Sequence, residues 1–231
     1  MPSGDASPFP QEHSMKHLRF YFDPISPYAA LAFERLPEAL AGCSYSVEYR
    51  PILFAALLHA VGQKGPAEIE HKRQWTFRQI AWAAHKLGIP MQVPAQHPFN
   101  PLPLLRLAWA SAPAGGTPNR LTVEKIFRHV WRAQGADAAS PERLAALTQE
   151  LNPPRDPASE EIKENLRDAS EQALKLGVFG VPTIEVDGKL FWGLDALEMV
   201  AAYLRGDPWF EQGDWEAAAR ARPGVVRRAM H

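Results

Sequence analysis

The stretch FYFDPISPYAALA, residues 20–32, decides the fold because it joins an aromatic strand to a helix through a short turn. The strand, predicted over residues 17–23, mixes aromatic and aliphatic side chains and stops at a proline. Ser26 then supplies a side-chain oxygen for a helix start, and Pro27 has a backbone preset for the first helical turn. A second strand is predicted over residues 45–50. The chain therefore opens as strand, helix, strand.

The C-terminal part of the sequence contains a second group of strands. Residues 183–186 and 189–192 are short apolar-patterned runs joined by Asp187-Gly188, a dipeptide typical of a two-residue hairpin turn. An apolar face with helical spacing follows over residues 197–204. The chain therefore closes as strand, strand, helix.

Between these two halves, residues 52–177 show helical periodicity and no comparable strand signal. Capping side chains followed by proline predict helix starts at Thr117-Pro118, Ser140-Pro141 and Asp156-Pro157. The proline-rich segment 91–103 is predicted to be a long surface loop. Because the two outer parts match the halves of a thioredoxin domain, the sequence predicts an α/β thioredoxin-like fold with a large all-helical insertion.

The predicted organisation has four parts. They are a disordered N-terminal extension (1–15), a thioredoxin-like domain in two halves (16–51 and 178–206), a helical insertion domain (52–177) and a C-terminal tail (207–231). The extension lacks the apolar core and basic start of a secretory signal. The longest strongly apolar stretch has about half the residues that a membrane span requires. Neither a signal peptide nor a membrane partner is expected.

The composition limits the chemistry. Cys43 is the single cysteine of the chain, which excludes an intramolecular disulfide and dithiol redox chemistry and fits a cytoplasmic location. The formal net charge is −1, with 25 basic and 26 acidic residues interleaved, so no nucleic-acid partner is expected. The 8 histidines show no metal-binding spacing, and the glycine patterns of nucleotide sites are absent. Cys43 and the tryptophans are interpreted as packing residues.

Ser26 is the first candidate site residue because a helix N-terminus favours an anion such as a thiolate. A helix terminus contributes roughly 0.3 to 2 kcal/mol, and a hydrogen bond to a charged group contributes roughly 1.5 to 3 kcal/mol. Since one pKa unit is about 1.4 kcal/mol, a thiol bound there would be largely ionised near neutral pH. Helix capping alone also explains Ser26-Pro27. A serine nucleophile is disfavoured because no G-x-S-x-G elbow surrounds Ser26.

Other positions could also serve a ligand. A cis bond at Val181-Pro182 would expose the Val181 backbone to an extended peptide; the alternative is an ordinary edge proline. Asp195 stands at the start of the last helix, where capping explains it best. Among scattered basic residues that could attract an anion, Lys64 lies in a loop flanked by glycine and proline.

With these motifs the chain resembles the 2-hydroxychromene-2-carboxylate isomerase family, relatives of kappa-class glutathione transferases in the DsbA-like thioredoxin superfamily. The resemblance rests on FYFDPISPYAALA, on the loop QKGP at 63–66, and on GVFGVPTIEVDGKLFWGLD at 177–195. It covers nearly the whole chain after Met15. Disulfide oxidoreductases of the DsbA type need a Cys-x-x-Cys motif, and this chain has Ser-Pro-Tyr-Ala from Ser26 to Ala29 instead.

The resemblance implies a glutathione cofactor and a role for each candidate residue. Ser26 would hydrogen-bond the glutathione sulfur, and Val181, before a cis-Pro182, would offer its backbone to the cysteinyl unit. Asp195 would bind the γ-glutamyl end, and Lys64 would lie near a glutathione carboxylate. In the family reaction the thiolate adds to a conjugated carbon, a bond rotates, and elimination releases the glutathione unchanged.

The implied function is glutathione-dependent isomerisation of an aromatic 2-oxo acid or chromene carboxylate, in a homodimer. Tyr28 would help to shape the pocket for the aromatic substrate. Leu194 and Ala196 depart from the family pattern, which usually has a polar side chain and an arginine there. The alternatives are a kappa-like transferase or glutathione-dependent oxidoreductase, and a non-enzymatic peptide-binding module of thioredoxin type.

Overall fold

The computed structural model describes residues 15–220 and, within them, a sheet of four strands in the order β2-β1-β3-β4. The strands are β1 (Lys16–Phe22), β2 (Tyr45–Pro51), β3 (Thr183–Val186) and β4 (Lys189–Trp192). β1 pairs in parallel with β2 and antiparallel with β3, which pairs antiparallel with β4. The predicted hairpin is confirmed, with Asp187 and Gly188 both at positive φ in its turn.

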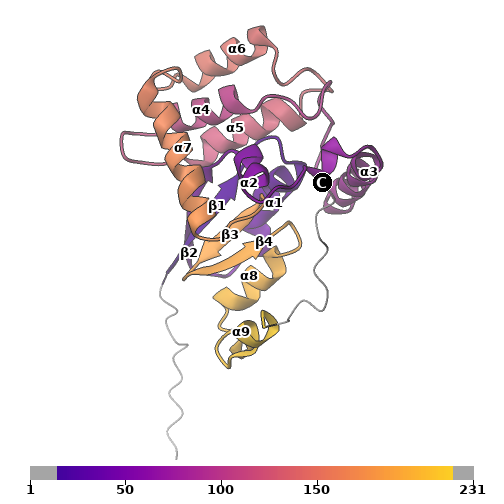
Figure 1. Ribbon diagram of the computed structural model, residues 1–231, viewed down its shortest axis with the longest axis vertical. Coiled ribbons are helices and arrows are strands. Elements are labelled where there is room, and N and C mark those ends of the chain that lie inside the picture. Colours follow the sequence, from indigo (N-terminus) through magenta and orange to yellow (C-terminus); the bar gives the residue numbers. More distant parts are fainter. Residues whose placement is uncertain (1–14, 221–231) are drawn as a thin grey trace, which may run out of the picture.

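Helices flank the sheet on both faces (Figure 1). The first strand pair is joined by α1 (Pro27–Ala39), and α8 (Leu197–Leu204) follows β4 and contacts α1. Between β2 and β3 the chain is helical, as predicted. The elements there are α2 (Phe54–Ala60), η1 (Pro66–Glu68), α3 (Glu70–Leu87), α4 (Leu102–Ala110), α5 (Arg120–Trp131), α6 (Pro141–Leu151) and α7 (Glu160–Lys175). The fold is therefore the predicted thioredoxin-like α/β fold with a helical insertion.

One of the three predicted helix starts in the insertion is confirmed and two are wrong. Ser140 caps α6, but α5 and α7 begin later than predicted and are capped by Asn119 and Ser159. The Asn119 and Ser159 side chains accept hydrogen bonds of 2.9 and 3.4 Å from the backbone amides three residues on. Asp156 instead accepts a bond from the amide two residues on, inside a turn. A proline after a capping residue thus also fits a turn that leads into a helix.

Asn119→Ala is expected to lower the free energy of unfolding by about 1 kcal/mol, because it removes the cap of α5. Urea unfolding monitored by circular dichroism measures the change. Thr117→Ala is the matched control, since Thr117 lies outside α5 and should leave the midpoint nearly unchanged. An equal loss in both variants would contradict the assignment of the cap to Asn119.

The proline-rich segment before α4 is only partly the predicted surface loop. It ends earlier than expected, because α4 begins at Leu102. The Phe99 side chain is 9% exposed and belongs to the main hydrophobic core. The segment therefore fills space beneath the helices as well as connecting them.

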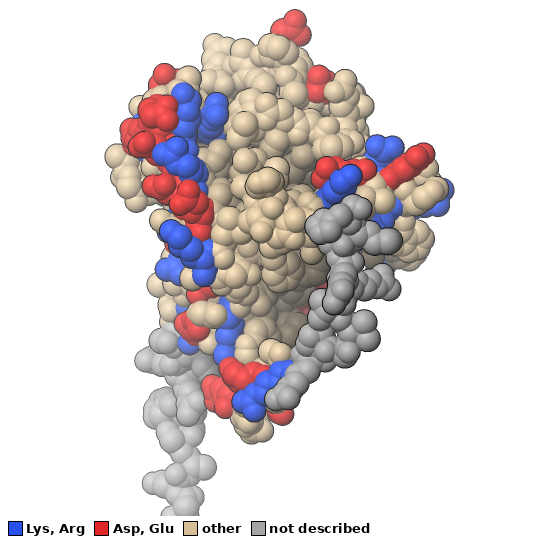
Figure 2. Space-filling model, viewed as in Figure 1, with Lys and Arg blue, Asp and Glu red and all other residues tan. Residues whose placement is uncertain are grey.

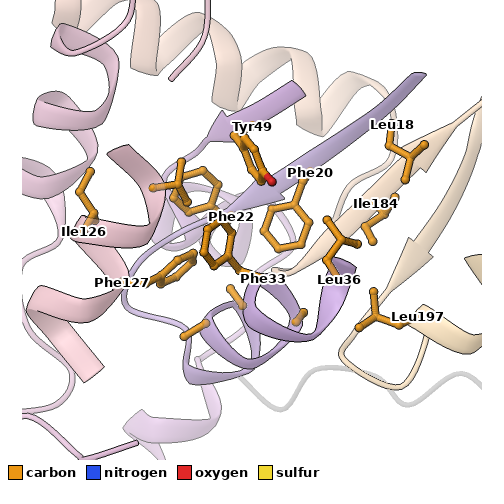
Figure 3. Close-up of a cluster of buried hydrophobic side chains, with 14 of the residues drawn as sticks. Leu18, Phe20, Phe22, Phe33, Leu36, Tyr49, Ile126, Phe127, Ile184 and Leu197 are labelled. Atoms are coloured by element: carbon orange, nitrogen blue, oxygen red, sulfur yellow. The ribbon is translucent and has the colours of Figure 1, made fainter. Parts of the chain in front are cut away.

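The main core lies between the sheet, α1, α5 and α8, and aromatic rings dominate its centre (Figure 3). The Phe127 ring centroid is 5.3 Å from those of Phe22 and Phe33, and Phe33 lies 5.6 Å from Tyr49. Such rings bury much apolar area at favourable tilted geometries. This packing holds α1 and the end of β1 in place.

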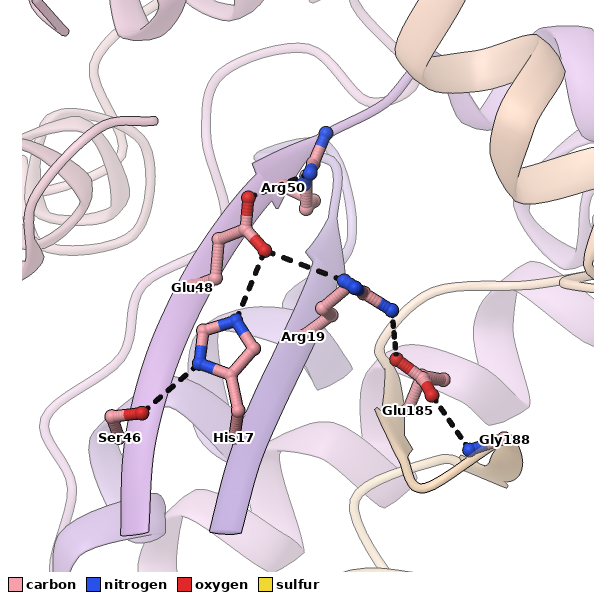
Figure 4. Close-up of polar contacts among 7 residues, drawn as sticks. All are labelled: His17, Arg19, Ser46, Glu48, Arg50, Glu185 and Gly188. Atoms are coloured by element: carbon pink, nitrogen blue, oxygen red, sulfur yellow. Dashed lines mark hydrogen bonds and ion pairs between the residues drawn. The ribbon is translucent and has the colours of Figure 1, made fainter. Parts of the chain in front are cut away.

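Polar side chains cross the other face of the sheet (Figure 4). Arg19 of β1 contacts Glu185 of β3 at 2.7 Å and Glu48 of β2 at 3.4 Å, and Arg50 contacts Glu48 at 2.7 Å. His17 also reaches Glu48. Because partly exposed ion pairs contribute little to stability, this network mainly covers this face of the sheet with charge.

The predicted C-terminal tail, residues 207–231, contains two short helices within its described part. They are η2 (Pro208–Phe210) and α9 (Asp214–Ala218). Phe210 is buried, and its ring centroid lies 6.0 Å from that of Phe191 on β4. Residues 207–218 therefore pack on the β4 and α8 end of the fold. Residues 1–14, which were predicted to be disordered, and residues 221–231 of the tail lie outside the described residues.

Candidate functional site

Ser26 occupies the position that links β1 to α1. Its backbone is extended (φ −85°, ψ 114°), and its Oγ accepts a hydrogen bond of 3.2 Å from the Ala29 amide, so it caps α1. The first turn of α1 carries no acidic side chain, which leaves the positive end of the helix dipole uncompensated by the helix itself. The Ser26 residue is 8% exposed. The geometry suits a small anion that approaches the helix start.

The structure brings Ser26 together with Val181, which lies 155 residues further along the chain. The Ser26 hydroxyl donates to the Val181 carbonyl oxygen at 3.2 Å. The Val181-Pro182 peptide bond is cis. The hydroxyl has one hydrogen, and a carbonyl can only accept, so in this structure that hydrogen is given to Val181.

The segment before β3 is fixed by further contacts. The Thr183 hydroxyl donates to the Gly180 carbonyl at 2.7 Å, and the Gly193 amide donates to the Pro182 carbonyl at 3.0 Å. The Trp192 indole nitrogen lies 2.5 Å from where a Cβ of Gly180 would stand, so only glycine fits there without a shift. Trp192 is 54% exposed, against the interpretation of the tryptophans as packing residues, whereas Trp109 and Trp131 are buried as expected.

Two further candidates are Tyr28, in the first turn of α1, and Asp195, between β4 and α8. The expectation that Asp195 caps α8 is wrong, because α8 begins at Leu197 and has no side-chain cap. The Asp195 side chain instead turns back over Gly193, where it occupies the place of a Cβ. Burial, and then the negative charge of Asp195, raise the pKa of the Tyr28 hydroxyl. Asp195 itself is exposed.

Tyr28 is tied to the helical insertion. Its hydroxyl donates to Gln79 Oε1 of α3 at 2.8 Å, and its half-buried ring packs beside Leu31 and Ile80. Tyr28 therefore links α1 to α3.

Lys64 is exposed in the turn between α2 and η1. Within residues 15–220 it makes no hydrogen bond or ion pair with Ser26, Val181 or Asp195. The next residue, Gly65, donates its amide to Glu68 at 2.6 Å, which holds the base of this turn. Lys64 is therefore exposed after the end of α2, and within the described residues it does not contact the other candidates.

Asp23 is the residue that the sequence reasoning missed. It is fully buried, and burial raises the pKa of its carboxyl group from 3.8 to about 7. Its two oxygens accept bonds of 3.0 Å from the amides of Ile25, next to Ser26, and Phe54, the first residue of α2. The available signal was a lone carboxylate at the end of an aromatic strand, three residues before Ser26. Such an acid cannot stay buried without partners.

Other site types find no support in the described chain. Residues 15–220 contain no group of three or more His, Cys, Asp or Glu side chains that could hold a metal ion. None of the helices in that range combines the length and the apolar character needed to cross a bilayer. Cys43 is half-buried and packs against the main core.

The chain belongs to the DsbA-like thioredoxin family, because the family model described as a DSBA-like thioredoxin domain matches residues 17–205. Glutathione S-transferase kappa 1 of Rattus norvegicus is 28% identical over 211 residues, which are 83% of this chain and 92% of the relative. 2-Hydroxychromene-2-carboxylate isomerase of Sphingobium xenophagum is 28% identical over 199 residues, 82% of this chain and 98% of the relative.

A solved structure of 2-hydroxychromene-2-carboxylate isomerase shares the fold. It superimposes with a TM-score of 0.70 at 22% identity and covers 89% of this chain and 100% of that chain. The similarity therefore extends through the helical insertion and is not restricted to the sheet.

Proposed function

We propose that this protein is a glutathione-dependent isomerase of 2-hydroxychromene-2-carboxylate-like aromatic 2-oxo acids. The observation that carries the proposal is the 3.2 Å contact between the Ser26 hydroxyl and the Val181 carbonyl, at the start of α1 and beside cis-Pro182. The chain has no cysteine at this helix start, so the reactive sulfur must come from a bound thiol. The similarity to the isomerase and to kappa 1 supports glutathione as that thiol.

The described residues fit the chemical groups of glutathione. The start of α1 and the Ser26 hydroxyl suit the sulfur, and the Val181 backbone suits the cysteinyl peptide group. The exposed Asp195 carboxylate offers a partner for the γ-glutamyl ammonium group. Lys64, in its exposed turn, offers a cation to a glutathione carboxylate. Asp195 and Lys64 thus offer charges opposite to the ammonium group and to one of the two carboxylates of glutathione.

The Ser26 hydroxyl changes partner in the proposed mechanism. Its hydrogen bond to the neutral Val181 carbonyl is replaced by one to a thiolate, which is the stronger acceptor because it is charged. The Ala29 amide continues to donate to Ser26 Oγ, which keeps the oxygen in place while its hydrogen turns. Bound glutathione would supply a nucleophile that adds reversibly to a conjugated carbon. The role of Ser26 is to keep that sulfur ionised and oriented.

The aromatic substrate needs an apolar surface next to the sulfur. The rings of Phe179 and Trp192 contact each other at a tilt of 56° with centroids 4.9 Å apart, and each residue is about half exposed. The surface over α2 also lacks charged side chains (Figure 2). We assign the aromatic part of the substrate to this uncharged side of the site, with the ring of Tyr28 on the α3 side.

The test is to incubate the protein with a chromene carboxylate and with catalytic or no glutathione. An isomerase converts the substrate only when glutathione is present. After the reaction all of the glutathione is recovered as free thiol. A kappa-like transferase, which the rat relative favours, would consume one glutathione per product as a stable conjugate. Chromatography of products and a thiol assay separate these outcomes. Conversion at an equal rate without glutathione would contradict the proposal.

Failure of the protein to bind glutathione, together with binding of extended peptides, would favour the peptide-binding alternative.

The homodimer and the cytoplasmic location stay predictions. Light scattering of the purified protein tests the homodimer.

A further inference from the structure

The two successive peptide units that precede Ser26, Pro24-Ile25 and Ile25-Ser26, are each held at both the carbonyl and the amide. In the first unit the Pro24 carbonyl accepts from the Trp131 indole at 2.9 Å, and the Ile25 amide donates to Asp23 Oδ1 at 3.0 Å. In the second unit the Ile25 carbonyl binds His97 Nε2 at 2.8 Å, and the Ser26 amide donates to the Asp23 carbonyl at 3.0 Å. The approach to Ser26 is therefore fixed on both sides.

The partners of the two carbonyls come from the helical insertion, far from Ser26 in sequence. Trp131 is the last residue of α5 and is buried, and His97 lies in the segment between α3 and α4. Their ring centroids are 5.8 Å apart, and the Phe77 ring of α3 meets the imidazole edge-on at 5.1 Å. These rings leave the imidazole little freedom to turn away from Ile25.

The bonding of His97 defines its chemical state. A carbonyl only accepts, so Nε2 must carry the hydrogen. Burial lowers the pKa of the imidazole, which is therefore neutral at neutral pH, with a bare Nδ1. Nδ1 is buried and has no hydrogen-bond partner within residues 15–220. His97 thus bears the cost of an unpaired buried nitrogen while it makes a single bond to the loop before Ser26.

We propose that His97 is a positioning residue, through which the helical insertion sets the orientation of the Ser26 hydroxyl. The Ile25 carbonyl and the Ser26 amide belong to one rigid peptide plane, so turning that plane moves Ser26 relative to Val181. The inference rests on the proposed function, because the hydroxyl matters for a bound thiol. It gives the helical insertion a role in the chemistry of the sulfur.

The experiment follows ultraviolet absorption of the bound glutathione thiolate as a function of pH. In His97→Leu the thiol pKa should rise by roughly half a unit to one unit, the size of one lost neutral hydrogen bond. His97→Gln keeps an N–H donor and should restore most of the shift. His129→Leu is the matched control, since His129 Nε2 binds the Ala138 carbonyl at 3.0 Å in the same insertion but away from Ser26. It should leave the thiol pKa unchanged.

Amide hydrogen exchange gives a second readout that does not need glutathione. The Ser26 amide should exchange faster in His97→Leu than in wild type or His129→Leu, because its peptide unit loses the bond that His97 makes to the Ile25 carbonyl. If glutathione binds and its thiol pKa is the same in His97→Leu as in wild type, the positioning role is wrong. Unchanged exchange would overturn it as well. A wild type that binds no glutathione would overturn the proposed function, and the exchange rates would then decide on His97 separately.

Discussion

Replacing Ser26 with alanine is expected to lower kcat/KM for the isomerisation roughly ten- to a hundredfold, the effect of losing a hydrogen bond to a charged group. The pKa of the thiol group of bound glutathione should rise by about one to two units, towards that of a free thiol. The reason is that Ser26 Oγ lies at the start of α1, and its single hydrogen is the group that can turn from Val181 to a sulfur. Stopped-flow rates and thiolate absorbance between pH 6 and 9 measure both effects.

Ser140→Ala is the control that separates catalysis from helix capping. Like Ser26, Ser140 is a cap whose Oγ accepts from the third amide of a helix with proline in its first turn. Both substitutions should therefore cost about 1 kcal/mol of stability. Only the Ser26 variant should show a smaller thiolate fraction of bound glutathione and a lower rate of isomerisation. Ser26→Thr keeps a hydroxyl and should therefore retain part of the thiolate fraction and part of the isomerisation rate. An unchanged thiol pKa in Ser26→Ala would reduce Ser26 to a cap.

Local patterns predicted the parts of this fold that depend on a few neighbouring residues. Asp187-Gly188 predicts the hairpin because a two-residue turn requires positive φ at both positions, and both have it. Ser26 before a proline predicts the start of α1 for a similarly local reason. The same pattern was wrong at Thr117 and Asp156, because a proline also fits the turn that leads to a helix.

The contacts that build the candidate site were beyond local patterns. The Ser26 hydroxyl meets a carbonyl 155 residues away, and only the resemblance to a known family suggested that pair. His97 and Trp131 reach the same loop from 72 and 107 residues away. His97 lies in the segment that was predicted to be a surface loop, and Trp131 is the last residue of α5. Long-range partners of this kind depend on how the insertion packs on the sheet. Periodicity does not carry that information.

Asp23 gives the largest expected effect on stability. In the folded protein burial raises the pKa of its carboxyl group to about 7, against an ordinary value of 3.8 in the unfolded chain. Between these two values the unfolded chain has lost the proton and the folded protein still holds it, so raising the pH favours unfolding. The contribution of Asp23 is therefore fully present below about pH 4 and is lost by about pH 7. Its size is about 4 kcal/mol, from a shift of about three units.

Asp23→Asn should remove this dependence, because an amide does not titrate. The variant should be less stable than wild type at pH 4, since its single acceptor oxygen satisfies only one of the Ile25 and Phe54 amides. The difference in the free energy of unfolding between wild type and Asp23→Asn should become smaller by about 4 kcal/mol as the pH rises to 8. Urea unfolding of both proteins at each pH measures this difference. Subtracting the two curves cancels the contributions of other titrating groups, including the half-buried His97 and His129, whose pKa values burial lowers. Asp168→Asn, at an exposed position on α7, should run parallel to wild type. A parallel curve for Asp23→Asn would mean that the Asp23 carboxyl titrates alike in the folded and unfolded chain.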